Sequence, residues 1–208
     1  MILKTTQLSK IAKEFIDKNE NKIKSTLTRL ILISPNFLQY KHNKDKMKKF
    51  LKLDLKIKAT SAIGEVFQSD QMVRPKRLNK EIEAKGADVV AYYKAKRETF
   101  RKNGRIVLLK PFDTTLYYRS GSYKITLTNV GKAVLVHEYV HHLLNNKKII
   151  GEILKLIDHN LFLKHNNGYS LEMINEGFAD LTAWNIYRNY NVAYIKEVEL
   201  VKREILGK

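Results

Sequence analysis

The chain has no cysteine among its 208 residues. A disulfide framework is therefore excluded, and no thiolate is available as a metal ligand. The absence also agrees with a reducing compartment. Residues 1–7 lack the apolar run of a signal peptide, and charged residues interrupt the most apolar stretch, 149–163. We therefore expect a soluble, cytoplasmic protein with no membrane partner.

Acidic residues are also scarce. Asp and Glu number 21 against 39 Lys and Arg, which gives a formal net charge of +18. Such a charge can attract nucleic acid or other anionic partners. However, 30 of the basic residues are lysine, whereas specific phosphate recognition favours arginine. A general lysine bias is thus the favoured explanation, although residues 1–60 concentrate the excess, with 15 basic and 5 acidic residues.

The length and the 44% hydrophobic content suffice for one good core. We expect a basic, helical N-terminal region over residues 1–60 and a second domain over 61–208, with one compact unit as the alternative. Hydrophobic spacing predicts helices, and runs of β-formers predict strands, so the fold class is α+β. The predicted helices are 6–33, 78–103, 149–163 and 193–206, and the predicted strands are 105–110, 115–119 and 122–128.

The motif with the most chemistry is His-Glu-Tyr-Val-His at residues 137–141. Side chains four residues apart lie on the same face of a helix, so His137 and His141 can hold one metal ion between them. Glu138 lies close to that metal but is angled away from it. A general base must lie there to take a proton from a metal-bound water.

The residues around this motif agree with a helix. Thr128 or Asn129 is the expected N-cap, and the helix is expected to end near Asn145. His142 follows the motif directly and points about 100° around the helix from His141. We therefore interpret His142 as a flanking or packed histidine and not as a ligand.

Two histidines do not complete a catalytic zinc site, which has three protein ligands and a fourth position for water. The metzincin pattern HExxHxxGxxH would supply a glycine and a third histidine. Leu144 and Lys147 occupy those two positions here, so the metzincin pattern is excluded. The main remaining option is a glutamate from a second helix.

Glu176 meets this requirement within the segment Asn-Glu-Gly-Phe-Ala-Asp at residues 175–180. Ser170 is a candidate N-cap for its helix. Asp180 lies one turn beyond Glu176, where a carboxylate can accept the free ring N–H of a ligand histidine. The helix is predicted from apolar residues at spacings of four and three, which are Ile174, Phe178 and Leu181.

With both segments present, residues 128–190 resemble the gluzincins, metallopeptidases with a glutamate as third ligand. The segment 175–180 matches the Asn-Glu-x-x-x-Asp spacing of thermolysin-type gluzincins and is similar to minigluzincin and peptidase-MA-like families. The resemblance implies a zincin-like fold, in which a small mixed or antiparallel sheet accompanies the HExxH helix and a glutamate helix. It also implies a zinc ion bound by His137, His141 and Glu176, with Glu138 as base and Asp180 supporting a ligand.

A peptidase also needs a donor to the oxyanion besides zinc. Tyr169 precedes Glu176 by seven residues, a spacing similar to that of the catalytic tyrosine in lethal-factor-like gluzincins. Tyr169 is therefore the candidate, with His165 and His159 as alternatives. In zincins, a strand beside the cleft binds the substrate as an added strand, and the candidate strand is 122–128.

Three functions are compatible with these observations. The first is a zinc peptidase acting on protein or peptide substrates, in which basic N-terminal segments block the cleft as a possible form of latency. The second is a regulatory protease of the ImmA/IrrE type that acts on a repressor. The third is a non-catalytic, basic nucleic-acid-binding protein on a zincin fold.

Overall fold

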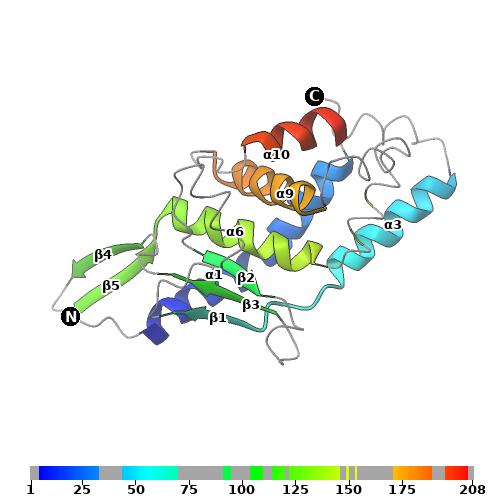
Figure 1. The fold of residues 1–208 in the computed structure, drawn as a ribbon. Helices are drawn as coiled ribbons and strands as arrows, with labels where there is room; N and C mark the ends of the chain where they lie inside the picture. Colours follow the sequence, from blue (N-terminus) through cyan, green and yellow to red (C-terminus); the bar gives the residue numbers. More distant parts are fainter. Residues whose placement is uncertain are drawn as a thin grey trace.

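The computed structural model describes residues 5–32, 44–69, 91–94, 104–109, 114–119, 122–145, 149, 153, 171–188 and 195–205. These residues form an α+β structure that is mostly helical (Figure 1). The helices are α1 (Thr5–Leu32), α3 (Lys44–Lys58), α6 (Asn129–Leu144), α9 (Leu171–Ile186), α10 (Ile195–Leu200) and a π-helical turn, η1 (Val201–Ile205). The strands are β1 (Glu65–Gln68), β2 (Ala91–Lys94), β3 (Arg105–Leu108), β4 (Thr114–Arg119) and β5 (Ser122–Leu127).

Most of the predicted elements are confirmed. The N-terminal helix, both motif helices, the C-terminal helix and the three predicted strands all occur close to the expected bounds. Helix α6 begins as its sequence predicts, because the Thr128 side chain accepts a hydrogen bond from the Gly131 amide at 3.0 Å. Of the predicted helix 149–163, Ile149 and Ile153 are helical and buried, and the other residues lie outside the described part.

The prediction of a helix over 78–103 is wrong where the structure describes it, because residues 91–94 form strand β2. β2 pairs antiparallel with β3, placing Tyr92 opposite Val107 and Tyr93 opposite Ile106. β1 pairs parallel with the other edge of β3, so the three-stranded sheet is mixed, in the order β1-β3-β2. β4 and β5 form a separate antiparallel hairpin.

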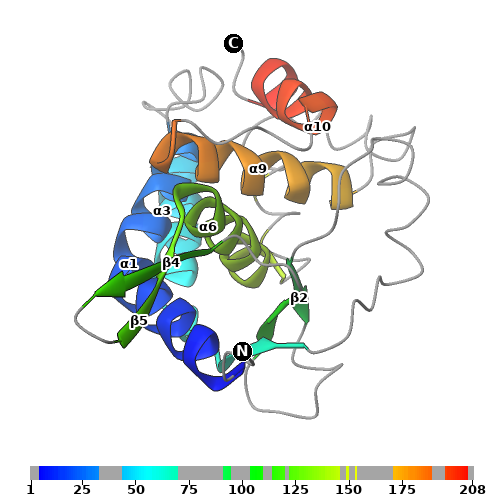
Figure 2. The same cartoon turned by 90° about the vertical axis from the view of Figure 1, so that its left-hand side faces the viewer.

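Helix α6 occupies the centre of the described structure. It lies between α9 and the three-stranded sheet (Figure 1), and α1 packs against it from another direction with α3 alongside (Figure 2). Residues from 1–60 and from 61–208 thus share a hydrophobic core cluster. Its most deeply buried members include Ile16, Ile23 and Leu27 of α1, Val136, Tyr139 and Val140 of α6, and Phe178 and Ala179 of α9.

A buried lysine ties α1 to the end of α3. Lys24 is 6% exposed, and its ammonium donates to the main-chain carbonyls of Lys58 and Thr60 at 3.0 and 2.8 Å. It also pairs with Glu20 at 2.5 Å. A cation at the last carbonyls of a helix is favourable because those groups lack intrahelical donors. Lys24 therefore fixes the connection from α3 toward β1.

Among the described helices, none combines the length and the apolar character needed to cross a bilayer.

Candidate metal centre

The two motif histidines lie on the face of α6 that meets α9. His137 and His141 are four residues apart, and their Nε2 atoms are 2.9 Å from each other. Their rings meet edge to face, with centroids 4.6 Å apart. His137, Glu138 and His141 form a buried to half-buried group whose ligand atoms all lie within 4.8 Å, so it can hold a metal ion.

Glu176 of α9 completes the convergence. Its Oε2 atom lies 3.1 Å from Nε2 of His137 and 3.2 Å from Nε2 of His141. Three ligand atoms of a tetrahedral zinc site, each about 2.1 Å from the ion, are separated by about 3.4 Å. The three observed separations are close to that value. These nitrogen and oxygen donors thus fit a small divalent metal such as zinc.

Residue 177 is glycine, which lets α10 and η1 come close to the backbone of α9 beside Glu176. A Cβ at Gly177 would collide with the main-chain oxygen of Glu197 and would lie 2.5 Å from Cγ2 of Val201. α10 and η1 can therefore pack directly on α9 beside Glu176. Glycine in a helix costs about 1 kcal/mol of intrinsic stability relative to alanine, so this close packing is the physical reason for its place here.

Asp180 supports the first histidine. It is fully buried on α9, one turn after Glu176, and its Oδ1 lies 2.6 Å from Nδ1 of His137. A carboxylate at that distance accepts a hydrogen bond from Nδ1–H, so Nε2 is the nitrogen that can bind a metal ion. This arrangement sets the tautomer and the orientation of a ligand histidine. Asp180 thus contacts His137, as its predicted role requires.

Burial and charge act together on the titrating groups. Burial disfavours the charged form of His137, yet the Asp180 and Glu176 carboxylates raise its pKa well above the ordinary value. Burial likewise opposes the charge of His141, whose pKa Glu176 raises. The pKa of Glu176 shifts in the opposite direction. Burial would raise the pKa of its carboxyl, but the two histidines outweigh burial and lower it. The cluster therefore holds a negative carboxylate among nitrogen donors.

Glu138 lies beside the cluster with a distinct environment. Burial raises the pKa of its carboxyl, and Glu176 adds to the rise, while His141, His137 and a hydrogen bond from the Tyr93 main chain lower it. The net rise makes this carboxylate a stronger base than an exposed glutamate. Side chains of His141 and Glu176 remain 12% and 18% exposed, so the cluster opens to solvent on that side.

His142 faces away from the candidate metal ligands, which confirms its interpretation as a packed histidine. Its Nε2 donates to the main-chain carbonyl of Ser61 at 2.7 Å. Burial lowers the pKa of His142, so the ring is neutral and Nδ1 accepts a bond from the Tyr93 hydroxyl at 3.2 Å. Asn145, the C-cap of α6, donates to the same hydroxyl at 3.3 Å.

Sequence reasoning missed Tyr93, since it placed this residue inside a helix. The run Val89 to Tyr93, which is rich in β-branched and aromatic residues, was the available signal for a strand. Tyr169, His159, His165 and Ser170 lie outside the described residues, so their predicted roles stay predictions.

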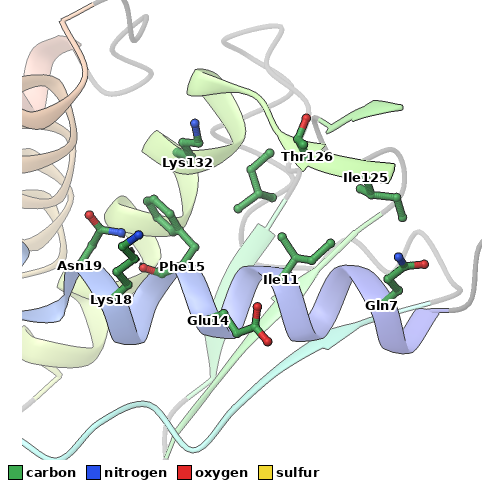
Figure 3. A pocket seen from close by; sticks show the side chains of 10 residues that line it. Gln7, Ile11, Glu14, Phe15, Lys18, Asn19, Ile125, Thr126 and Lys132 are labelled. Carbon is green, nitrogen blue, oxygen red and sulfur yellow. Dashed lines mark hydrogen bonds between the residues drawn. The ribbon is translucent and has the colours of Figure 1, made fainter. Parts of the chain in front are cut away.

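A separate cavity of about 530 Å³ lies between α1, β5 and the first turn of α6 (Figure 3). Lys132 borders it, on the stripe of α6 that also carries Val136 and Tyr139 and is opposite to His141. β5 therefore borders the α1 side of α6. None of the candidate metal ligands lines this cavity. The lining residues are Gln7, Ile11, Glu14, Phe15, Lys18, Asn19, Ile125, Thr126, Leu127 and Lys132.

Comparison with known protein families, with curated proteins and with solved structures finds no match to the chain. The residues of the site and the distances between them define what it can bind. These establish a His137–Glu138–His141 group able to hold a metal ion, with Glu176 in contact with both histidines.

Proposed function

We propose that this protein is a zinc-dependent peptidase of the gluzincin type, with a zincin-like fold. The observation that carries the proposal is the convergence of Nε2 of His137, Nε2 of His141 and Oε2 of Glu176 within 3.2 Å of one another. Three protein ligands with an open side are typical of catalytic zinc, whereas structural zinc sites are closed by four ligands.

The donor set favours zinc over the common hard cations. Two imidazoles and one carboxylate suit zinc, whereas magnesium and calcium prefer oxygen ligands throughout. Zinc, when bound, lowers the pKa of a water ligand and polarises a carbonyl oxygen. The chain's own part is to hold His137 through Asp180 and to keep Glu176 ionised between the two histidines.

Glu138 is the proposed general base. Its carboxylate belongs to the same group as the two histidines but is not needed as the third ligand, because Glu176 contacts both of them. Burial raises the pKa of Glu138, which makes this carboxylate a better proton acceptor than an exposed glutamate, and the proton can later pass to a leaving amine. The reaction class that uses these roles is hydrolysis of a peptide bond.

The sheet supplies a place for an extended substrate. β2 is an edge of the three-stranded sheet among the described residues, and it packs against α6. The main chain of Tyr93 in β2 reaches the Glu138 carboxylate. A peptide that adds to this edge as a further strand would bring its carbonyls to the proposed base. β2 therefore replaces 122–128 as the proposed substrate strand.

The test combines metal analysis with peptide cleavage. Purified protein should contain about one zinc per chain, and a chelator should abolish cleavage of a broad peptide library. Glu138→Gln should keep zinc but lose at least a hundredfold in kcat/KM, consistent with the usual contribution of a general base. Glu199→Gln, an exposed glutamate on α10, is the matched control and should retain full activity.

Cleavage retained by Glu138→Gln, or a protein that binds no zinc, would refute the proposal. The His141→Ala variant tests zinc binding separately from the role of Glu138 as a base. It should lose zinc, because Nε2 of His141 lies 2.9 Å from Nε2 of His137 and 3.2 Å from Glu176.

A further inference from the structure

Tyr93 connects the edge strand to the active-site helix through its side chain. Its hydroxyl donates to Nδ1 of His142 at 3.2 Å and accepts from Asn145 at 3.3 Å. Its ring meets the His142 ring edge to face, with centroids 5.5 Å apart. His142 is held in turn by the Ser61 carbonyl at 2.7 Å. Three segments that are distant in sequence are thus linked here: Ser61, Tyr93 and the end of α6.

The neighbouring strand is shaped to accept this phenol. Gly104 immediately precedes β3, and a Cβ there would lie 2.6 Å from Cε2 of Tyr93 and overlap the ring. Gly104 and Ile106 lie on the same face of the sheet because side chains alternate along a strand. Since Tyr93 is opposite Ile106, its ring crosses directly over the glycine. The absence of a side chain at Gly104 therefore gives Tyr93 its path to α6.

The main-chain amide of Tyr93 makes a separate contact at the outer edge of β2. In an antiparallel pair, opposed residues alternate between exchanging hydrogen bonds and directing their amide and carbonyl groups outward. The Tyr93 amide is hydrogen-bonded to Glu138, so it is directed away from β3 and toward the outer edge of β2. One residue therefore combines a side-chain anchor on α6 with a main-chain contact to the proposed base.

We propose that Tyr93 is a positioning residue: together with His142 and Asn145 it sets the separation between the outer edge of β2 and Glu138. A substrate peptide paired with that edge then presents its scissile carbonyl to the base. This inference rests on the proposed peptidase function. It also predicts substrate class, since only peptides long enough to pair with β2 profit from the alignment.

Substrate length therefore distinguishes positioning from general support of the fold. β2 contains four residues, Ala91–Lys94. An extended peptide gains roughly 3.3 Å of strand per residue, so a peptide of about four residues or more can lie along this edge. The outward Tyr93 amide stays bonded to Glu138, and the peptide pairs with the other outward groups of β2. A dipeptide or tripeptide reaches the metal without using this edge. Loss of alignment should thus penalise long substrates and spare short ones.

The experiment compares Tyr93→Phe with Tyr92→Phe in the zinc-loaded, full-length protein. Tyr93→Phe removes one hydroxyl and its two hydrogen bonds but keeps the ring over Gly104. Tyr92→Phe makes the same change at the neighbouring strand position, opposite Val107. Asn145→Ala, at an exposed position, is a second and milder variant that removes one of the two bonds.

The first measurement is amide hydrogen exchange over residues 91–94, which requires no activity. Tyr93→Phe should accelerate exchange about tenfold, since two hydrogen bonds of ordinary net strength are lost, and Tyr92→Phe should not. Equal exchange in Tyr93→Phe and wild type would overturn the anchor. This measurement tests whether the Tyr93 hydroxyl holds β2 on α6, whether or not the protein cleaves peptides. If it cleaves none, the proposed function fails on its own.

The second measurement is kcat/KM for a long and a short peptide at equal zinc content. Tyr93→Phe should lose about tenfold on the long peptide and less than about threefold on the short one. An equal loss on both peptides, or no loss on either, would overturn the positioning role. The activity control is Tyr187→Phe, which removes a hydroxyl directly after α9, where the ring of Tyr187 lies 6.4 Å from that of Phe15. This variant should match the wild type on both peptides.

Discussion

Oδ1 of Asp180 lies 2.6 Å from Nδ1 of His137, and the Asp180 side chain is completely buried. The contact joins α9 to α6 beside the His137–Glu138–His141 group, one helical turn from Glu176. A carboxylate in this position both restrains the imidazole ring and increases its basicity toward a metal. α6 thus supplies the two histidines of the candidate site, and α9 supplies Glu176 together with the carboxylate that supports His137.

Asp180→Asn should weaken zinc binding by about 10- to 100-fold while the fold persists, because the amide has nearly the same shape but carries no charge. Competition with a chromophoric chelator measures the affinity. Asp54→Asn, which alters a carboxylate paired with Lys58 at 2.6 Å, is the matched control and should leave zinc binding unchanged. Equal affinities in Asp180→Asn and wild type would contradict the assigned role.

Gly177→Ala should lower the free energy of unfolding by about 1–3 kcal/mol, the usual cost of forcing a methyl group into a packed site. The clash with Val201 and the Glu197 main chain opposes the gain of about 1 kcal/mol expected for alanine in an unobstructed helix. Thermal unfolding measures the sign of the change. A stabilised variant would show that α10 does not pack on Gly177 as described.

Glu20→Gln should remove a pH-dependent contribution to stability. Burial alone would raise the pKa of Glu20, but the hydrogen bond and the positive charge of Lys24 lower it below 4.5. A lowered pKa in the folded state contributes stability that is present above pH 4.5 and is lost as the pH falls through the folded value. The wild type should therefore exceed the variant in stability near pH 7, and the difference should disappear in acid.

Urea unfolding at a series of pH values tests this prediction. Glu14→Gln is the control, because Glu14 is an exposed residue of the same helix, 4.0 Å from Lys10. Its effect should be small throughout the series. A Glu20→Gln difference that persists unchanged below pH 4 would argue against the charged contact with Lys24.

Leu27→Ala should cost about 2–5 kcal/mol of unfolding free energy, since Leu27 of α1 is completely buried in the core cluster shared with α6 and α9. Leu55→Ala on α3, where the leucine is 63% exposed, should cost far less. Denaturant unfolding compares the two. By the same argument, deletion of residues 1–60 should unfold the protein and not activate it.

Local signals account for what the sequence predicts well. Thr128 marks the start of α6, and the i, i+4 spacing of His137 and His141 places both on one face. Glu176 and Asp180 share the next helix by the same spacing. Each of these inferences depends on residues within one or two turns, where helical geometry alone decides which side chains are neighbours.

Strand β2 depended on distant partners. Tyr92 and Tyr93 pair with Val107 and Ile106 across a separation in sequence that no local pattern reveals. Short apolar runs fit a helix and a strand equally well, and tertiary pairing decides between them. The same limit explains why the sequence favours 122–128 as the substrate strand: this segment is adjacent to α6 in sequence, whereas β2 reaches Glu138 only through the fold.

His141 and His142 are consecutive residues that contact different parts of the structure. The first meets His137 and Glu176 on one side of α6, and the second meets Ser61 and Tyr93 on another. A single inserted or deleted residue between Thr128 and His137 would turn the rest of the helix by about 100° relative to its cap. Both sets of partners would be missed at once. This half of α6 should therefore tolerate substitutions far better than insertions or deletions.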